Sequence, residues 1–288
     1  MMVYLKNFKL PEMIAEELFL NDIRQTCYDS FYPFGIFPQK GFSAVDFEPI
    51  TIFYGSNGSG KTTLLNVIAE AIGAQRSAPY NNSSFFADFS RMCQVEWESY
   101  YQDSTIITSD DVFDYLFDLR ALNHGVDTKR EDLMEAYRQL RCEKFQLKSL
   151  DDYEKLKQVN SARRNTKSEF IRQNMPGNAR GRSNGESAFM YFTEKIEANQ
   201  IYLLDEPENS LSAAYQQELT GFIEDSARFF NCQFIIASHS PFILATKQSK
   251  IYDLDALPVT ERRWTELENV RRYFEFFKSH EEELLAET

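Results

Sequence analysis

The sequence predicts an α/β protein with a mostly parallel sheet, an N-terminal antiparallel part and a small helical insert. In the C-terminal half, short apolar segments alternate with helical segments, which is the order of strands and helices in a parallel sheet. The first fifty residues contain short β-like segments broken by proline and glycine. The middle of the chain is highly charged, and its apolar residues recur at helical spacing.

The N-terminal region predicts short antiparallel strands. Residues 2–10 alternate apolar and polar side chains, as a strand with one buried face does. Residues 31–54 are rich in aromatic and β-branched side chains. Turn-forming residues interrupt this segment at Pro33, Gly35, Pro38 and Gly41.

The parallel sheet is predicted from apolar segments that have the length of buried strands. The predicted strands are residues 51–54, 201–204, 234–237 and 251–254, and the predicted helices are residues 61–73 and 212–230. Ligands of such sheets bind at the carboxyl ends of the strands, so the residues after each strand are the first to examine.

The middle of the chain, about residues 111–180, predicts a helical insert within a single domain that covers residues 1–288. The helical stretches are residues 111–122, residues 129–158 as one or two helices, and a further helix through about residue 174. No heptad pattern persists over several repeats, so we do not expect a long coiled-coil arm.

The C-terminal tail, about residues 261–288, predicts an amphipathic helix. Its apolar residues are Trp264, Leu267, Val270, Phe274 and Phe277. Such a face either docks on a partner or packs on its own domain, and we expect the second.

Composition narrows the class of protein. The chain has 288 residues, 43% of them hydrophobic, which is enough for a sizeable core. No run approaches the roughly 18–20 apolar residues that span a bilayer, and the N-terminus lacks the pattern of a signal peptide. We therefore expect a cytoplasmic protein without membrane contact. The cysteines form no metal motif and are expected to be small buried side chains: Cys27, Cys93, Cys142 and Cys232.

Residues 55–62, GSNGSGKT, match the pattern GxxxxGK[ST] between a predicted strand and a predicted helix. The glycines let backbone N–H groups surround phosphates, and the start of the helix attracts the same anion. Lys61 would reach the β- and γ-phosphates, and the hydroxyl of Thr62 would ligate Mg²⁺. The motif predicts a P-loop NTPase that binds ATP with Mg²⁺. The predicted nucleotide-binding residues here are Gly55, Ser56, Asn57, Gly58, Ser59, Gly60, Lys61, Thr62 and Thr63.

The segment IYLLDE, residues 201–206, places two carboxylates at the end of a buried strand. We expect Asp205 to hold Mg²⁺ through water and Glu206 to polarise the attacking water as a general base. The alternative is an acidic turn, DEPEN, that faces solvent.

His239 directly follows the predicted strand 234–237 and Ser238. A histidine in this place can donate a hydrogen bond to the γ-phosphate, whereas a lone histidine is more often a structural residue. Because this strand comes after the one that ends in the acidic pair, we favour the catalytic role.

Residues 183–186, SNGE, open a predicted helix that runs to about residue 196. The hydroxyl of Ser183, the backbone of Gly185 and the helix N-terminus together predict a second anion site, to which Glu186 also belongs. Taken alone, the segment would be an ordinary helix cap.

In this order, the four motifs resemble those of the ABC-type ATPases. The closer likeness is to the soluble SMC- and RecF-like branch, and to short AAA-labelled ATPases found beside prokaryotic defence genes, such as those of retron and Septu systems. The resemblance covers nearly the whole chain and covers the helical insert least.

The resemblance implies a role for each motif. Residues 55–62 resemble the Walker A motif, the strand ending in Asp205 and Glu206 resembles Walker B, and His239 resembles the switch histidine. Residues 183–186 are similar to the ABC signature, which binds the γ-phosphate held by a second protomer.

Proteins of this kind work as ATP-sandwich dimers with two composite sites, and their opening on hydrolysis drives a partner. Residues 209–212 resemble the D-loop of that interface. Ser212 stands where transporters have Asp, and Arg182 and Asn184 replace the usual Leu and Gly of the signature. These departures favour the soluble branch over a transporter subunit.

Two features of the family stay unassigned. The candidates for the Q-loop are Ser109, Asp110, Gln94 and Gln102, and those for the aromatic that stacks on adenine are Tyr32, Phe34 and Phe37.

The formal net charge of −13 repels nucleic acid as a whole. One stretch, residues 161–182, runs against this trend with six basic residues and one acid. It would contact nucleic acid or an acidic partner, or it is a solvated helical face, which we favour. The basic residues considered for nucleic-acid contact are Arg163, Arg164, Arg172 and Arg180.

The first functional hypothesis is a Mg²⁺-dependent ATPase that dimerises on ATP and drives or regulates a partner, in DNA maintenance or anti-phage defence. The catalytic residues would be Glu206, His239 and Lys61, with Thr62 and Asp205 at the metal. A second hypothesis is a nucleotide-gated module that restrains an effector protein with slow turnover. A third is the nucleotide-binding subunit of a transporter.

Overall fold

The computed structural model describes the chain except for residues 24–27, 29, 143–152, 175–182 and 287–288. The chain divides into two compact units. The first comprises Met1–Phe113 with Asn184–Thr288, and the second is Asp114–Ser183. Each unit is described by itself below.

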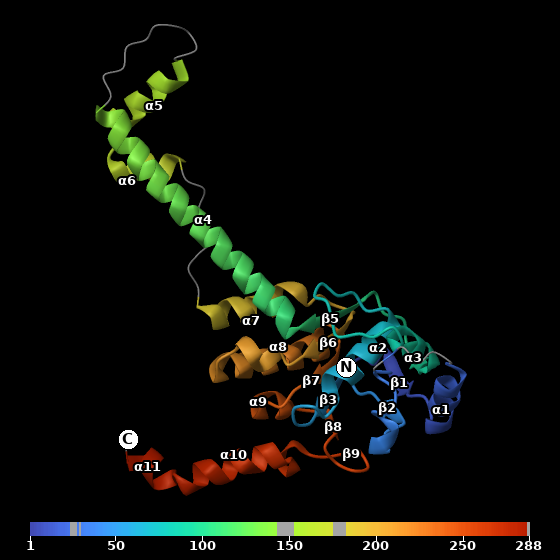
Figure 1. The fold of residues 1–288 in the computed structure, drawn as a ribbon. Helices are drawn as coiled ribbons and strands as arrows, with labels where there is room; N and C mark the ends of the chain where they lie inside the picture. The colour runs from blue at the N-terminus through green and yellow to red at the C-terminus, as the bar shows by residue number, and fades with distance from the viewer. Residues whose placement is uncertain (24–27, 29, 143–152, 175–182, 287–288) are drawn as a thin grey trace. The chain divides into compact units, whose positions relative to one another are not determined.

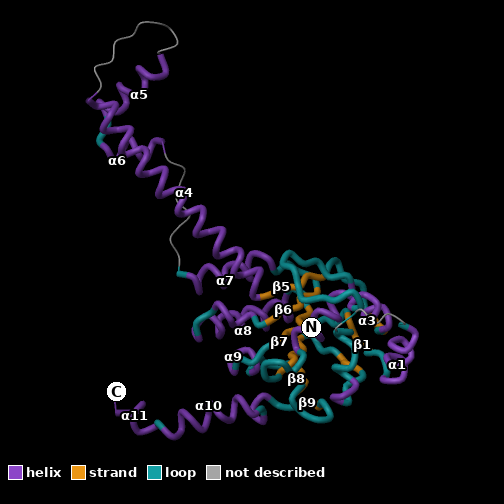
Figure 2. Tube along the Cα trace, viewed as in Figure 1, coloured by secondary structure: helices purple, strands orange, loops and turns teal. Residues whose placement is uncertain are grey.

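The centre of the first unit is a sheet in which five strands run parallel (Figures 1 and 2). Within the described residues, the strand order is β5-β6-β7-β3-β8-β9, and only β9 pairs antiparallel. The strands are β3 Ile50–Tyr54, β5 Ser104–Thr108, β6 Ile201–Asp205, β7 Gln233–Ala237, β8 Lys250–Asp253 and β9 Thr260–Glu261. Every residue of β3, β6 and β7 is buried, as expected for strands that are covered on both faces. The α/β prediction with a mostly parallel sheet is confirmed.

Helices cover both faces of this sheet. Figure 1 shows the strands between α2 on one side and α8 and α9 on the other. The helices are α2 Lys61–Ile72, α3 Phe86–Met92, α7 Asn184–Lys195, α8 Ala213–Phe229 and α9 Pro241–Leu244. Helix α2 packs on β5, β6 and β7 through a fully buried apolar side. It ends where Gly73 adopts the left-handed conformation that suits a glycine after a helix.

A second, antiparallel sheet comes from the N-terminal region, in the order β2-β1-β4. Its strands are β1 Leu5–Lys9, β2 Ala44–Asp46 and β4 Gln94–Trp97. One fully buried side chain joins it to the parallel sheet. Gln233 accepts from the backbone N–H groups of Tyr4 and Leu5, each at 2.9 Å, and donates to the carbonyl of Leu5 at 2.9 Å.

The N-terminal region differs from the sequence prediction in its detail. Residues 31–43 form turns and the short 3-10 helix Pro38–Lys40, and strand structure begins only at Ala44. A helix that was not predicted, α1 Met13–Asp22, follows β1. Its side chains Ile14 and Leu18 are 68% and 66% exposed, so it has no core-facing apolar stripe from which periodicity could identify it.

The second unit is helical. Helix α4, Ser109–Cys142, begins in the first unit and continues into the second, followed by α5 Tyr153–Arg164 and α6 Lys167–Asn174. A small core of Tyr137, Ala162 and Phe170 joins these three helices. The predicted break after residue 122 was wrong, because α4 is one helix of 34 residues and about 51 Å. Residues 123–128 lack apolar side chains at helical spacing, but they are helical all the same.

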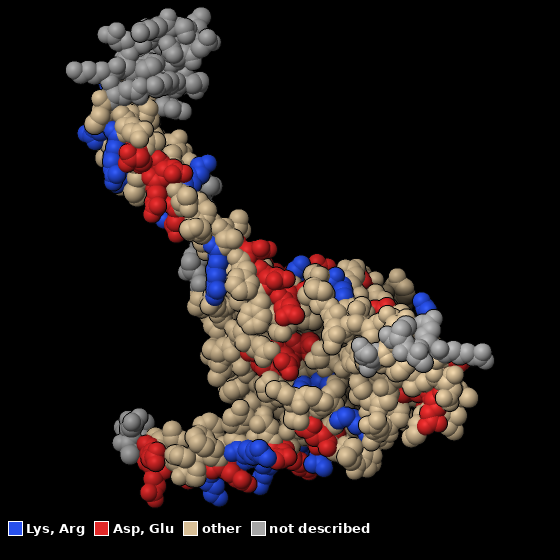
Figure 3. Space-filling model, viewed as in Figure 1, with Lys and Arg blue, Asp and Glu red and all other residues tan. Residues whose placement is uncertain are grey.

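The C-terminal tail also differs from its prediction. It contains the 3-10 helix Trp264–Glu266, α10 Glu268–Ser279 and α11 Glu281–Ala286, instead of one helix from residue 261. Leu267 and Val270 are buried in the first unit. The remaining aromatic side chains of α10 are 44–57% exposed: Tyr273, Phe274, Phe276 and Phe277. The expectation that this apolar face packs on its own domain therefore holds for Leu267 and Val270 and is wrong for Phe274 and Phe277. Figure 3 shows charged side chains along the lower edge of this helix.

Candidate nucleotide-binding site

The loop between β3 and α2 has the geometry that its glycines predict. A Cβ atom at Gly55 would lie 2.4 Å from Oγ of Ser59, so only glycine fits there. Gly58 and Gly60 have φ of +82° and +93°, in the left-handed region that other residues rarely adopt. Gly60 is the N-cap of α2, so the free N–H groups of the first helical turn face the loop. This arrangement is suited to binding phosphate.

Lys61 is buried, with 4% of its surface exposed, and its ammonium folds back over this loop. Nζ donates to the carbonyl oxygens of Gly55, at 2.8 Å, and Ser56, at 3.2 Å. The same nitrogen lies 3.8 Å from Oε1 of Glu206, which directly follows β6. The charge is thus directed at the space between the loop and β6.

Thr62 and Asp205 supply the oxygens expected of a Mg²⁺ site. The hydroxyl of Thr62 donates to Oδ1 of Asp205 at 3.1 Å. Burial raises the pKa of the Asp205 carboxyl to about 6, and the bond from Thr62 opposes that shift. A hydroxyl and a carboxylate fit Mg²⁺, which prefers hard oxygen ligands and usually keeps water and substrate phosphates in its shell. In the part of the chain that the structure describes, no group of three or more acidic, His or Cys side chains forms a complete metal site.

Glu206 adopts an unusual backbone conformation at the end of β6. Its φ of 48° and ψ of 54° are left-handed, which is costly for a residue other than glycine and is often found at functional sites. Oε2 accepts from Nδ2 of Asn209 at 3.0 Å, and Oε1 lies 3.8 Å from Nδ1 of His239. The side chain is 26% exposed, so water can reach the carboxylate. These properties suit a general base.

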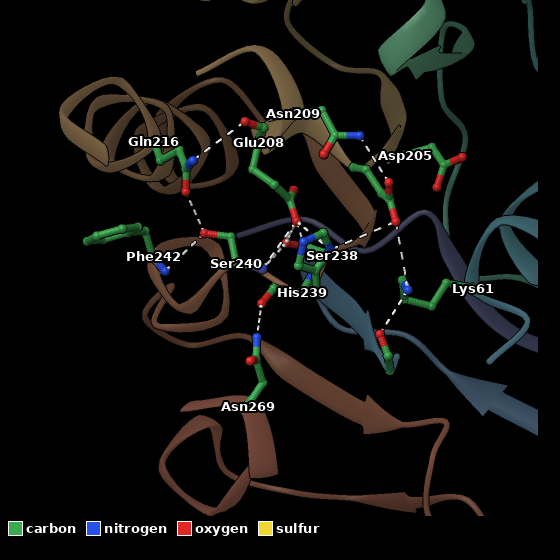
Figure 4. Close-up of polar contacts among 12 residues, drawn as sticks. Lys61, Asp205, Glu208, Asn209, Gln216, Ser238, His239, Ser240, Phe242 and Asn269 are labelled. Atoms are coloured by element: carbon green, nitrogen blue, oxygen red, sulfur yellow. Dashed lines mark hydrogen bonds and ion pairs between the residues drawn. The ribbon is translucent and has the colours of Figure 1, made fainter. Parts of the chain in front are cut away.

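His239 contacts Glu206 through Nδ1. The loop that carries this histidine is fixed from two sides (Figure 4). Glu208 accepts from the hydroxyl of Ser238 and the backbone N–H of His239 and Ser240. From α10, the side chain of Asn269 donates to the carbonyl of His239 at 2.8 Å. The alternative that DEPEN is a solvent-facing turn is wrong for Glu208, which is 5% exposed.

Asp255 is a further residue that the sequence did not identify. Its carboxylate accepts from the backbone N–H of Ser56 at 2.7 Å and from the hydroxyl of Ser56 at 3.0 Å. Asp255 comes two residues after β8, which pairs with β3. The pairing of β3 with β8 brings the ends of the two strands together. A sequence analysis that predicted this pairing could have identified Asp255.

The loop and the histidine also line one cavity of about 500 Å³. Its lining residues are Tyr54, Gly55, Ser56, Asn57, His239, Asp255, Glu268, Asn269 and Arg272. A larger cavity of about 1000 Å³ is lined by residues 245–251 and 261–266 with Glu48, and none of the four motifs contributes to it. Because the glycine loop and His239 line the smaller cavity, we take that cavity as part of the candidate site.

The segment 183–186 lies on different elements from this cluster. Gly185 and Glu186 are in the first turn of α7, and Ser183 directly precedes it. A Cβ atom at Gly185 would lie 3.0 Å from Cδ2 of Tyr215, so this glycine permits close approach to α8. The structure thus gathers Lys61, Thr62, Asp205, Glu206 and His239, and places this helix start against α8.

The unassigned aromatic has fewer candidates in the structure. Phe37 is 1% exposed in the core, and Phe34 stacks on Phe19 at 5.0 Å. Tyr32 is half-buried, and its hydroxyl donates to Oγ1 of Thr63 in α2 at 3.0 Å. Tyr32 is therefore the half-buried candidate with a hydrogen bond to the phosphate-binding helix, whereas Phe37 is buried beside Gly60 at the start of that helix.

The Q-loop candidates lie in three places. Ser109 and Asp110 open α4, Gln94 is in β4, and Gln102 is in the loop before β5. None of these positions separates one candidate from the others.

The basic and cysteine residues are only partly within the described chain. Arg163 and Arg164 are in the last turn of α5 and Arg172 is in α6, whereas Arg180, Arg182 and Cys27 lie outside the described residues. Burial raises the pKa of the Cys93 and Cys232 thiols to about 12 and 11. Cys142 is exposed, so the expectation of a buried side chain was wrong there.

Among the described helices, none combines the length and the apolar character that crossing a bilayer requires. No curated protein matches the sequence.

The fold is similar to several solved structures at low sequence identity. One is the Smc head domain with an extended coiled coil from Pyrococcus furiosus, bound to the C-terminal domain of ScpA. The two sequences are 13% identical, the match covers 96% of this chain and 100% of that chain, and the TM-score is 0.38. The SMC head domain from Thermotoga maritima has 11% identity, coverage of 90% and 98%, and a TM-score of 0.37. A metal-chelate type ABC transporter in an inward-facing conformation has 16% identity, coverage of 79% and 76%, and a TM-score of 0.37.

The family comparison covers most of the molecule. The model of the AAA domain matches residues 33–284, which include the glycine loop, the acidic strand end and His239. The chain therefore belongs to the AAA domain family.

Proposed function

We propose that this chain is a Mg²⁺-dependent ATPase that acts as an ATP-sandwich dimer and drives or restrains a partner protein. The observation that carries the proposal is the meeting of four groups at the ends of β3 and β6. The ammonium of Lys61 and the carboxylate of Glu206 lie 3.8 Å apart, and the hydroxyl of Thr62 bonds the carboxylate of Asp205. These are the groups that phosphoryl transfer to water requires.

The chemistry is an in-line attack of water on the γ-phosphate. The glycine loop and Lys61 bind the phosphates and neutralise charge that develops on them. Glu206 orients the water and accepts its proton, and His239 donates a hydrogen bond to the γ-phosphate. Thr62 and Asp205 would hold Mg²⁺, which neutralises charge on the β- and γ-oxygens when bound.

The second half of each site would come from another protomer. Ser183, Gly185 and Glu186 resemble a signature that acts in trans, and Gly185 and Glu186 lie at the start of α7, against α8. In this proposal residues 1–288 form one ATPase domain, with the insert at about 111–180 as its helical subdomain. The partner processes would be DNA maintenance or anti-phage defence, as in the relatives that the sequence resembles.

The test uses Glu206→Gln, which preserves the shape of the site and removes the base. We expect molar mass measured by light scattering to change from monomer to dimer on addition of Mg-ATP. We expect turnover to fall by at least roughly 10²-fold while ATP still binds. Glu218→Ala, at an exposed glutamate of α8, is the matched control. Turnover at the unaltered rate in Glu206→Gln would exclude Glu206 from the mechanism.

A second function uses the same residues: a gate in which ATP occupancy restrains an effector. The exposed aromatic side of α10 favours it, because exposed apolar patches mark interaction sites and Asn269 connects this helix to the loop of His239. Tight ATP binding with turnover far slower than the roughly 1–10³ s⁻¹ that is typical of enzymes would support the gate.

A further inference from the structure

Glu208 lies beside the candidate site, and the mechanism above assigns it no task. Its Oε1 atom accepts three hydrogen bonds: from Oγ of Ser238 at 2.7 Å, from N of His239 at 2.9 Å and from N of Ser240 at 3.1 Å. All three donors belong to the loop that follows β7 (Figure 4). One carboxylate oxygen thus fixes the backbone on both sides of the histidine.

The same carboxylate faces the imidazole. Nδ1 of His239 lies 3.4 Å from Oε1 of Glu208, which is closer than its 3.8 Å to Oε1 of Glu206. Two buried polar atoms without a protein partner lie on these neighbouring groups: Oε2 of Glu208 and Nδ1 of His239. Buried polar atoms in native proteins are almost always satisfied, so a donor on one group and an acceptor on the other form the natural pair.

The remaining groups around the loop have other tasks. Asn269 bonds the carbonyl of His239, and Gln216 accepts from the hydroxyl of Ser240 at 2.6 Å. Neither reaches the imidazole. Among the described residues, only Glu206 and Glu208 bring a carboxylate within ion-pair distance of the ring. The Glu206 carboxylate already has Asn209 at Oε2 and Lys61 at Oε1.

We propose that Glu208 is a positioning residue for His239. Its carboxylate fixes the loop backbone and accepts a hydrogen bond from Nδ1–H. Nε2 is then the ring nitrogen that meets the nucleotide, and in the doubly protonated ring it donates a hydrogen bond to the γ-phosphate. In histidine, the hydrogen bond of one ring nitrogen sets the protonation of the other. This inference rests on the proposed function, because it gives Glu208 its task at the same site.

The first experiment measures the tautomer directly and needs no turnover. The chain has three histidines, so ¹⁵N spectra of the imidazoles contain few signals, and His239→Gln identifies those of His239. We expect the neutral ring of His239 to carry its proton on Nδ1 in the unaltered protein. In Glu208→Ala neither carboxylate oxygen remains to accept from Nδ1, so the proton is expected on Nε2. The same tautomer in both proteins would overturn the proposal.

The second experiment is a double-mutant cycle on ATP turnover with Glu208→Ala and His239→Ala. If Glu208 acts through the histidine, we expect Glu208→Ala to lower turnover at least roughly 10-fold, with ATP affinity changed less than about 3-fold, and the double variant to be no slower than His239→Ala. If the double variant is slower than His239→Ala by the full factor that Glu208→Ala alone causes, Glu208 has a general structural role and the proposal is overturned.

Controls separate failure of this inference from failure of the proposed function. Glu218→Ala removes an exposed glutamate from α8 and is expected to leave the tautomer and turnover unchanged. If His239→Ala lowers turnover and Glu208→Ala does not, the inference fails and the ATPase mechanism stands. If the unaltered chain hydrolyses no ATP, the proposed function fails, and the tautomer still decides whether Glu208 positions the ring.

Discussion

At the scale of single residues, Asp205 combines burial with a task that requires charge. Its raised pKa of about 6 means that the carboxyl takes up a proton near neutrality, and a protonated acid cannot ligate a metal. The isolated site therefore favours the neutral acid as pH falls, and bound Mg²⁺ favours the ionised one.

We expect apparent Mg²⁺ affinity to weaken about fourfold between pH 7.5 and pH 5.5, because the ionised fraction of Asp205 falls from nearly all to about a quarter. The measurement is a Mg²⁺ titration at each pH, followed by the fluorescence of a dye-labelled ATP bound to the Glu206→Gln variant. Adding Asp205→Asn should give weak affinity at both pH values. An equal pH effect in that variant would assign the titration to the nucleotide.

Gly55 is a second residue with a testable role, because its lack of a side chain leaves room for Ser59 in the loop. We expect Gly55→Ala to weaken ATP binding at least roughly 10-fold, because the new methyl group would lie 2.4 Å from Oγ of Ser59 and the loop would have to shift. Gly221→Ala adds the same methyl group where no atom lies within 4 Å and is the control. Calorimetric titration with ATP measures both.

The residues that sequence reasoning missed share one property. Glu208, Asp255 and Asn269 act through partners that are distant along the chain: Glu208 bonds the loop 30–32 residues later, and Asp255 bonds Ser56 across 199 residues. Local spacing contains no trace of such contacts. Lys61, Thr62, Asp205 and Glu206 were identified because each belongs to a short motif beside a predicted strand.

At the scale of elements, the apolar strands were predictable because burial on both faces gives an unbroken apolar run. The predictions at 51–54, 201–204, 234–237 and 251–254 are confirmed within one or two residues. Strand β4 was missed because its side chains are exposed or half-buried and show no regular pattern. Helix α10 was predicted with its apolar residues, but periodicity alone cannot say whether anything covers the face.

The antiparallel sheet depends on one side chain of the parallel sheet. We expect Gln233→Ala to lower the free energy of unfolding by roughly 2–4 kcal/mol, because it leaves the N–H groups of Tyr4 and Leu5 buried without an acceptor. Urea unfolding followed by circular dichroism measures the change. Gln217→Ala, at an exposed position of α8, should change stability by less than about 0.5 kcal/mol.

At the scale of the whole molecule, the composite site makes a quantitative prediction. A Lys61→Ala chain lacks its own phosphate-binding half, and a Ser183→Arg chain lacks the half it would give to a partner. We expect each variant alone to be inactive and an equal mixture to recover roughly a quarter of normal turnover. The reason is that half of the dimers are mixed and one of two sites in each is intact. An inactive mixture, with mixed dimers shown by tagged pull-down, would contradict action in trans.

The bond between Asn269 and the carbonyl of His239 has an optical consequence. The chain has two tryptophans, Trp97 in β4 and Trp264 five residues before Asn269, with 40% and 39% of their surfaces exposed. In Trp97→Phe, the indole of Trp264 would be the single tryptophan emitter of the protein. Its emission would therefore report, without any added dye, whether nucleotide at the glycine loop changes the surroundings at the start of α10.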